Sequence, residues 1–223
     1  MSVLAGRSVL VTAGGTREPI DAVRFLGNRS SGRMGVALAA EARRRGADVT
    51  LIAANLSVEP PAGVEVVEAS TAAELGRETL RRANSDVVLM TAAVADYRPA
   101  SRINGKRGKD DRPWQLELEP TEDILRALTA KTANGRVVVG FAAETGVDGL
   151  ERARTKRTSK KVDLLVYNDV GDPDIGFESS ENEVVILSDE GERHVRRAPK
   201  ERIAAEILDD VERVLRRHGG ATD

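Results

Sequence analysis

The chain has 223 residues, with no cysteine, two histidines and 3% aromatic residues. Without sulfur at fixed spacings it forms no thiol nucleophile, disulfide framework or thiolate zinc site, and His194 and His218, both in charge-rich sequence, argue against a histidine-based triad. The 34 basic and 36 acidic side chains give a net charge of -2, so no overall field favours a nucleic acid or an anionic membrane.

Short β-branched segments alternate with longer segments of helical period, which is typical of a parallel sheet covered by helices. In chain order we predict a strand over Ser8 to Thr12, a helix over Gly32 to Arg45 ended by Gly46, a strand over Asp48 to Ala53, a helix over Thr71 to Ala83, a strand over Asp86 to Thr91, a helix over Thr121 to Lys131, and strands over Arg136 to Phe141 and Val162 to Tyr167.

The pattern changes near the C-terminus. Glu183 to Leu187 and Arg193 to Arg196 flank a turn and predict an antiparallel hairpin. A last helix begins near Pro199 and ends at Gly219 and Gly220. We therefore expect one α/β domain over residues 1–223, with a Rossmann-like parallel sheet flanked by helices and an added hairpin.

Two connections are long for loops in a compact domain, Arg17 to Ser31 and Ala93 to Arg112. Ordered loops of that length are usually functional, and we expect further strands around Trp114 to Leu118. The apolar runs are too short to cross a bilayer and no leader sequence opens the chain, so we expect a soluble, cytoplasmic protein.

Glycines and serines mark a ligand site at the start of the predicted sheet. The first strand runs into Gly14 and Gly15 at its carboxyl end, where open α/β folds bind ligands. The segment Asn28-Arg29-Ser30-Ser31-Gly32 leads directly into the first helix. Two hydroxyl groups at a helix N-terminus favour a phosphate.

The usual dinucleotide and P-loop motifs are absent. Gly14-Gly15 is separated from Gly32 by a long insertion, and the second strand ends in Ala53-Ala54-Asn55, with no carboxylate for a ribose. The pattern therefore favours a mononucleotide bound in another manner, or a phosphorylated metabolite.

Charged groups follow the third strand and precede the fifth. Asp96 can bind a ribose hydroxyl, a base amine or magnesium. Lys106, Arg107 and Lys109 lie on a glycine-containing loop that can bring ammonium groups onto phosphates. Lys156 and Lys160 are four residues apart and share one face if their segment is helical, where both can reach the same phosphates as the lysine loop. A charge run of this kind is also typical of a solvated surface, so the spacing leaves both readings open.

Four stretches together carry a family resemblance: VTAGGTREPIDAVRFLGNRSSGRMG, TAAVADYRP, GFAAET and RTKRTSKKVDLLVYNDV. With them the chain resembles the phosphopantothenoylcysteine synthetases of coenzyme A biosynthesis, in their bacterial CTP-using form. The resemblance implies a ligase that first forms an acyl-cytidylate from phosphopantothenate and CTP, releasing pyrophosphate. The amine of cysteine then displaces CMP.

The resemblance also implies roles for residues at matching positions. Asn28 would act on the acyl-cytidylate in the second step, and Lys106 would assist its formation in the first. Magnesium would accompany the triphosphate, with Asp96 as its possible ligand. The implied nucleotide-binding residues are Gly15, Ser30, Ser31, Gly32, Ala92, Asp96, Lys106, Phe141, Lys156 and Lys160, and the implied substrate-binding residues are Asn28, Arg29 and Ala93.

One departure concerns the lysine loop, which commonly reads K-x-K-K in the family and here reads Lys106-Arg107-Gly108-Lys109. The family is dimeric, so the resemblance implies a homodimer, and we expect the hairpin and the extended loops to supply its interface. In many bacteria this domain is fused behind a flavin-dependent decarboxylase, so the resemblance implies either a stand-alone enzyme or one half of a fusion. Two alternatives stay open: an NAD(P)-dependent reductase or epimerase, and a non-catalytic nucleotide sensor.

Overall fold

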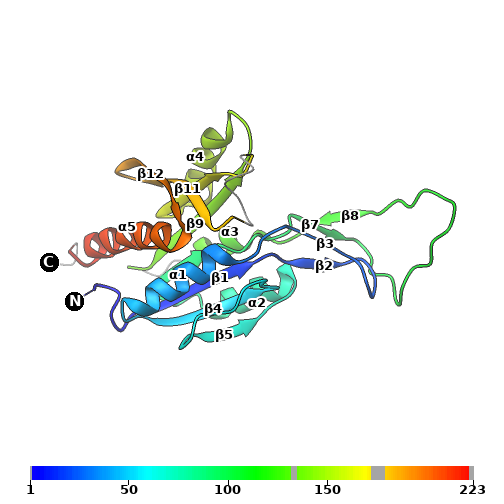
Figure 1. The fold of residues 1–223 in the computed structure, drawn as a ribbon, viewed down its shortest axis with the longest axis horizontal. Helices are drawn as coiled ribbons and strands as arrows, with labels where there is room; N and C mark the ends of the chain where they lie inside the picture. Colours follow the sequence, from blue (N-terminus) through cyan, green and yellow to red (C-terminus); the bar gives the residue numbers. More distant parts are fainter. Residues whose placement is uncertain (1, 132–134, 172–178, 221–223) are drawn as a thin grey trace.

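The structure is a computed structural model that describes residues 2–131, 135–171 and 179–220. At its centre is an eight-stranded sheet of order β12-β11-β10-β9-β6-β1-β4-β5 (Figure 1). Six neighbouring strands are parallel, and the last two form an antiparallel hairpin beside β10. The strands are β1 (Ser8–Gly14), β4 (Asp48–Ala54), β5 (Glu65–Glu68), β6 (Val87–Met90), β9 (Val137–Glu144), β10 (Leu164–Asp169), β11 (Glu181–Ser188) and β12 (Gly191–Pro199).

Five helices in the described residues cover the two faces of the sheet: α1 (Arg33–Arg44) and α5 (Lys200–Gly220) on one, and α2 (Ala72–Arg81), α3 (Ile124–Ala130) and α4 (Gly149–Lys160) on the other (Figure 1). Side chains that alternate between the two faces of β1 pack against both helical layers. Val9 and Val11 pack in the cluster with α1 and α5, whereas Leu10 packs in the cluster with α2 and α3. The expected α/β fold is confirmed.

None of the helices in the described part of the chain combines the length and the apolar composition that a membrane span requires.

The two long connections form short strands, and the sequence pattern predicted only the one near Leu118. β2 (Arg17–Pro19) pairs with β3 (Phe25–Gly27), and β7 (Tyr97–Pro99) pairs with β8 (Leu118–Pro120). Both ribbons lie side by side and project from the sheet with the loop between β7 and β8 (Figure 1). We call residues 17–27 and 97–120 the arm. The prediction of strands around Trp114 to Leu118 was partly wrong, because β8 starts only at Leu118.

The base of the arm is tied to the body by a buried carboxylate. Glu18 in β2 is 3% exposed, and its Oε1 accepts a hydrogen bond of 2.8 Å from the backbone N–H of Ala72 at the start of α2. The positive end of the α2 dipole also stabilises a carboxylate at this position. The arm is therefore anchored at its base.

Two body elements were also missing from the prediction, for different reasons. β5 is a four-residue edge strand that is mostly exposed, so it lacks an apolar pattern. α4 buries only Gly149 and Ala153, so it lacks the apolar stripe from which helices are recognised. The helix predicted from Thr121 begins instead at Ile124, because the Asp123 side chain caps it by accepting from the N–H of Arg126.

Candidate functional site

The candidate site is built where the loops after β1 and β6 meet. Gly14 has φ of 91°, and a Cβ added to it would lie 1.9 Å from the carbonyl oxygen of Ala54. Its own carbonyl accepts a 2.8 Å hydrogen bond from the N–H of Ala93, and Thr16 donates to the Ala93 carbonyl at 3.1 Å. Only glycine fits at position 14, because a side chain there would collide with the Ala54 carbonyl. The hydrogen bonds to Ala93 bring the loop after β6 to the end of β1.

The N-terminus of α1 packs directly beside this crossing, where a Cβ on Gly32 would lie 3.2 Å from the Gly14 nitrogen. Gly32 occupies the cap position with φ of 84° and supplies no side-chain cap. Ser30, Ser31 and the first residues of α1 line the cleft at this end. Uncapped N–H groups and the positive end of the helix dipole make this wall suited to an anion.

Both features border a cleft of about 620 Å³, in the range of small-molecule sites. It gathers most of the residues implied by the resemblance, although they come from four separate segments. Those lining it are Asn28, Ser30, Ser31, Gly32, Ala92, Ala93, Asp96, Phe141, Lys156 and Lys160.

Asn28 is held against the loop that follows β6. Its side-chain Nδ2 donates to the Val94 carbonyl oxygen at 3.0 Å, and the residue is exposed to solvent. This contact orients an amide, which does not titrate, at the wall of the cleft.

Threonines that the sequence reasoning missed shape the same loop. Thr91 Oγ1 donates to the Thr12 carbonyl at 2.6 Å, and Thr12 Oγ1 accepts from the N–H of Ala92 at 3.1 Å. Thr121 Oγ1 donates to the Ala95 carbonyl at 2.6 Å, and the Thr121 N–H donates to the Asp96 carbonyl at 2.9 Å. The backbone that carries Asp96 is thus fixed by hydroxyl groups from other segments.

Two lysines of α4 form the opposite wall. The Lys156 ammonium donates to the Phe141 carbonyl oxygen at 2.9 Å, and burial lowers the Lys156 pKa. Lys160 pairs with Asp123. Burial alone would raise the pKa of Asp123, but its bonds to Lys160 and to the N–H of Arg126 outweigh this and hold the pKa below its usual value. Since α4 is helical, both lysines share the face expected for it.

The described residues contain no group of three or more histidine, aspartate or glutamate side chains arranged to hold a metal ion. Asp96 is exposed at the edge of the cleft and offers one carboxylate. A magnesium ion here would need its remaining oxygen ligands from a bound phosphate and from water, which is how magnesium is commonly held.

Three of the implied site residues lie outside this cleft. Gly15 lies beneath its wall, where a Cβ would be 2.8 Å from the Asn28 carbonyl oxygen. Arg29 lines a separate, adjoining hollow with Arg17 and Phe25. Lys106 lies on the arm, next to Gly105, whose carbonyl accepts from the N–H of Ala22.

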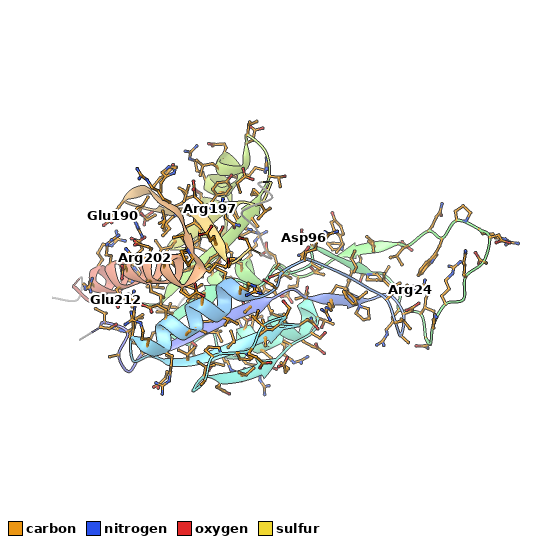
Figure 2. The ribbon with its side chains drawn as sticks, viewed as in Figure 1. Arg24, Asp96, Glu190, Arg197, Arg202 and Glu212 are labelled. Atoms are coloured by element: carbon orange, nitrogen blue, oxygen red, sulfur yellow. The ribbon has the colours of Figure 1, made fainter. Side chains whose placement is uncertain are left out.

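The expectation that the two basic clusters meet at one site is therefore not met within one chain. The reason is that the arm carries its loop away from the body (Figure 1). Figure 2 shows the separation, with Asp96 near the base of the arm and Arg24 toward its far end.

The cleft also contains polar residues that were not predicted: Glu122, Asp123, Asn168, Asn182 and Lys200. Asn168 directly follows the apolar part of β10 at the carboxyl edge of the sheet, and that position could have indicated it. Asn182 and Lys200 reach the cleft only because β11 starts and β12 ends at this edge.

Comparison with known proteins gives a consistent result. Residues 4–215 match the family model described as the DNA/pantothenate metabolism flavoprotein C-terminal domain. The coenzyme A biosynthesis bifunctional protein CoaBC of Mycobacterium tuberculosis is 46% identical over 220 residues, which cover 93% of this chain and 52% of that protein. The chain thus spans about half the length of the curated relatives it matches.

Solved structures agree with this match. A crystal structure of the C-terminal domain of CoaBC superposes with a TM-score of 0.81 at 34% identity, covering 97% of this chain and 99% of that chain. A mutant of Cab2 in complex with phosphopantothenate-cysteine has a TM-score of 0.79 at 18% identity, covering 96% and 89%, and shows a shared fold.

Lys200 generates a testable pH dependence. It is 4% exposed, donates to the Ser179 carbonyl at 2.6 Å, and burial, together with the nearby Arg33, lowers its pKa from 10.5 to about 8. Between these two values the unfolded chain binds the proton and the folded chain does not. The free energy of unfolding therefore rises with pH in this window, by up to about 3 kcal/mol.

Urea unfolding of the protein and of Lys200→Met across that window checks this. We expect the difference in unfolding free energy, native protein minus variant, to increase with pH. A difference that stays constant from about pH 8 to pH 10.5 would contradict the assignment.

Proposed function

The chain belongs to the family described as the DNA/pantothenate metabolism flavoprotein C-terminal domain, and on this premise we propose that it is a phosphopantothenate–cysteine ligase that uses CTP. The proposal includes a cytoplasmic location, one synthetase domain over residues 1–223, and a place beside a flavin-dependent decarboxylase either in one chain or as a separate protein.

One observation carries the proposal: the cleft has an anion-binding helix end on one wall and two ammonium groups on the other. The N-terminus of α1 faces the lysines of α4 across the ends of β1, β6 and β9. A triphosphate spanning this gap is neutralised from both sides. The backbone of Phe141, fixed by Lys156, and the small Ala92 and Ala93 leave room for a flat base beside it.

In the proposed first step, a carboxylate oxygen of phosphopantothenate bonds to the α-phosphorus of CTP while the bond to pyrophosphate breaks. Both reactants are anions, so the protein must offset their repulsion and align them in line. Lys156, Lys160 and the α1 N–H groups do this in the cleft, and Lys106 stabilises the charge that develops on the phosphoryl oxygens.

In the second step, the amine nitrogen of cysteine bonds to the acyl carbon, CMP leaves with the former carboxylate oxygen, and the amine loses a proton. Asn28 is oriented by the Val94 carbonyl and donates to the acyl-cytidylate. An amide suits this role because it stabilises an oxyanion without taking up a proton itself.

Magnesium, held by the phosphates, water and Asp96, would supply positive charge at the triphosphate. Asp96 fits this use because it is an exposed carboxylate at the edge of the cleft.

The structure gives a specific reason to prefer this ligase over an NAD(P)-dependent reductase. Dinucleotide-binding folds place an acidic residue for the ribose at the end of the second parallel strand, which is β4 here. In this chain Asn55 follows β4, and its Nδ2 donates to the carbonyls of Gly15 and Ser70 at 3.0 and 2.9 Å. An amide tied to the backbone in this way does not replace the carboxylate that a dinucleotide ribose requires.

We also propose a homodimer formed through the arm. The arm exposes apolar side chains on short ribbons, with Val23 62%, Phe25 51%, Tyr97 53% and Leu118 41% exposed. Such side chains on a projecting element favour burial against another surface. A dimer in which each arm reaches the partner's cleft would also bring Lys106 to a triphosphate that it does not reach in its own chain.

The assay that tests the function supplies CTP, magnesium, phosphopantothenate and cysteine. CMP should form only when all are present, and without cysteine the reaction should stop after the release of at most about one pyrophosphate per site. A sensor would bind CTP without turnover. Lys156→Met should weaken CTP binding by about tenfold, because it removes an ammonium group from the cleft wall. Lys161→Met, beyond the end of α4 and exposed, is the matched control and should change it less than about twofold. Thermal stabilisation by NADH and not by CTP would refute the proposal.

Asn28→Asp separates the two steps. The new carboxylate faces the Val94 carbonyl and cannot donate to an oxyanion, so conversion of the acyl-cytidylate should slow by about 100-fold while its formation stays largely intact. Single-turnover measurements of pyrophosphate and CMP release follow the two steps separately. Equal loss in both would remove Asn28 from the second step.

Complementation tests the dimer. If the arm acts on the partner's cleft, mixed dimers of Asn28→Asp and Lys106→Gln chains contain one intact site, and co-expression should restore about a quarter of the native activity. Sedimentation of the native chain should show a dimer. Inactive mixed dimers would instead indicate that each chain uses its own Lys106.

A further inference from the structure

The loop that carries Lys106 has little regular structure of its own. Between β7 and β8, two backbone–backbone hydrogen bonds join it to the β2–β3 ribbon: Ile103 N–H to the Ile20 carbonyl at 3.0 Å, and Ala22 N–H to the Gly105 carbonyl at 3.1 Å. A third, from the Ala100 N–H to the Glu117 carbonyl at 3.0 Å, closes the loop at its own base. Lys106 itself is exposed. The backbone bond at Gly105 holds the residue before Lys106, and the contact that holds the residue after it comes from a side chain.

Asp21 makes the principal side-chain connection. Its side chain is 0% exposed, although it lies near the tip of the β2–β3 ribbon. Oδ1 accepts from the N–H groups of Val23 and Arg24, both at 2.8 Å. Oδ2 accepts from the N–H of Arg107 at 3.3 Å and pairs with the Arg24 guanidinium at 3.1 Å. One oxygen therefore forms the turn, and the other holds the residue next to Lys106.

The charge of Asp21 is maintained by the same contacts. Donation from the N–H of Val23, and further donation from Arg24 and Arg107, lowers the Asp21 pKa against the opposing effect of burial. The carboxylate therefore stays ionised at neutral pH.

Trp114 completes the cluster from the far side of the loop. The guanidinium carbon of Arg107 lies 4.6 Å from the indole centroid, and that of Arg24 lies 5.2 Å from it. Arg24 also donates to the Arg107 carbonyl at 2.5 Å. The indole is thus held by two cations, one from the ribbon and one from the loop.

We propose that Asp21 and Trp114 are positioning residues for Lys106: with Arg24 and Arg107 they clamp the lysine loop onto the β2–β3 ribbon, so that Lys106 is presented at a defined place on the arm. This inference rests on the proposed role of Lys106 in the first step. It explains why a buried carboxylate and the chain's single tryptophan occur on an otherwise exposed loop.

Asp21→Asn tests the clamp selectively. The amide oxygen can keep the bonds that form the turn, whereas the amide nitrogen meets two donors, the Arg107 N–H and the Arg24 guanidinium. Because Trp114 is the only tryptophan, its emission reports on the cluster directly. We expect a red shift and at least about a twofold rise in acrylamide quenching, since the ring loses its cationic neighbours.

The functional readout separates positioning from folding. In single-turnover reactions, Asp21→Asn should slow formation of the acyl-cytidylate by about tenfold or more, while the Kd for CTP changes less than about twofold. Trp114→Leu should behave likewise, and Trp114→Phe should restore most of the rate because it keeps an aromatic face. Asp111→Asn, which makes the same charge change at an exposed position of the same loop, should change neither readout.

The outcomes distinguish the clamp from the proposed function. Unchanged Trp114 emission in Asp21→Asn would overturn the clamp, and altered emission with a normal first step would overturn the positioning role. Lys106→Gln should slow the first step and leave the emission unchanged. A normal first step in Lys106→Gln would refute the role of Lys106, and with it the functional part of this inference, while the emission data would still test the clamp.

Discussion

The close approach of backbone at the ends of β1 and β6 is the constraint on which the cleft depends. Gly14 adopts positive φ with no room for a Cβ, and its carbonyl receives the N–H of Ala93. Gly15 lets the backbone of Asn28 approach closely, because a Cβ at this position would lie 2.8 Å from the Asn28 carbonyl oxygen. The floor of the cleft is consequently made of backbone and small side chains. Such a floor offers N–H groups and shape, and charge has to come from the walls.

Those walls explain how a chain of nearly neutral net charge can favour a polyanion. α1 contributes the positive end of its dipole, and α4 contributes Lys156 and Lys160, one helical turn apart. Both ammonium groups are already held by oxygen atoms, one by the Phe141 carbonyl and the other by Asp123. Fixed cations need little reorganisation when phosphates arrive, which is the form of electrostatic stabilisation that phosphoryl chemistry uses.

The arm is stabilised by different interactions from those of the body. The body buries its strands between two helical layers, whereas the arm consists of three-residue strands held by a few charged contacts, among them Glu18 at its base and Asp21 near its tip. Buried carboxylates that accept backbone N–H groups replace the apolar packing that such a thin element lacks. The arm therefore lacks the apolar periodicity from which strands are predicted, and the sequence pattern indicated mostly loops there, whereas it predicted most of the body.

The sequence by itself determined the α/β class, the strand and helix order of the body apart from β5 and α4, and most of the cleft: the glycines and serines around α1, Asp96, Phe141, and the spacing of Lys156 and Lys160. These features depend on short-range periodicity, on glycine conformation and on the rule that parallel strands end at one edge. Only the tertiary structure decided that Asn182 and Lys200 join this edge, that Lys106 stands apart from it, and that Asp21 and Trp114 meet. Those outcomes depend on the direction of β11 and β12 and on contacts between distant segments, and no local pattern along the chain encodes them.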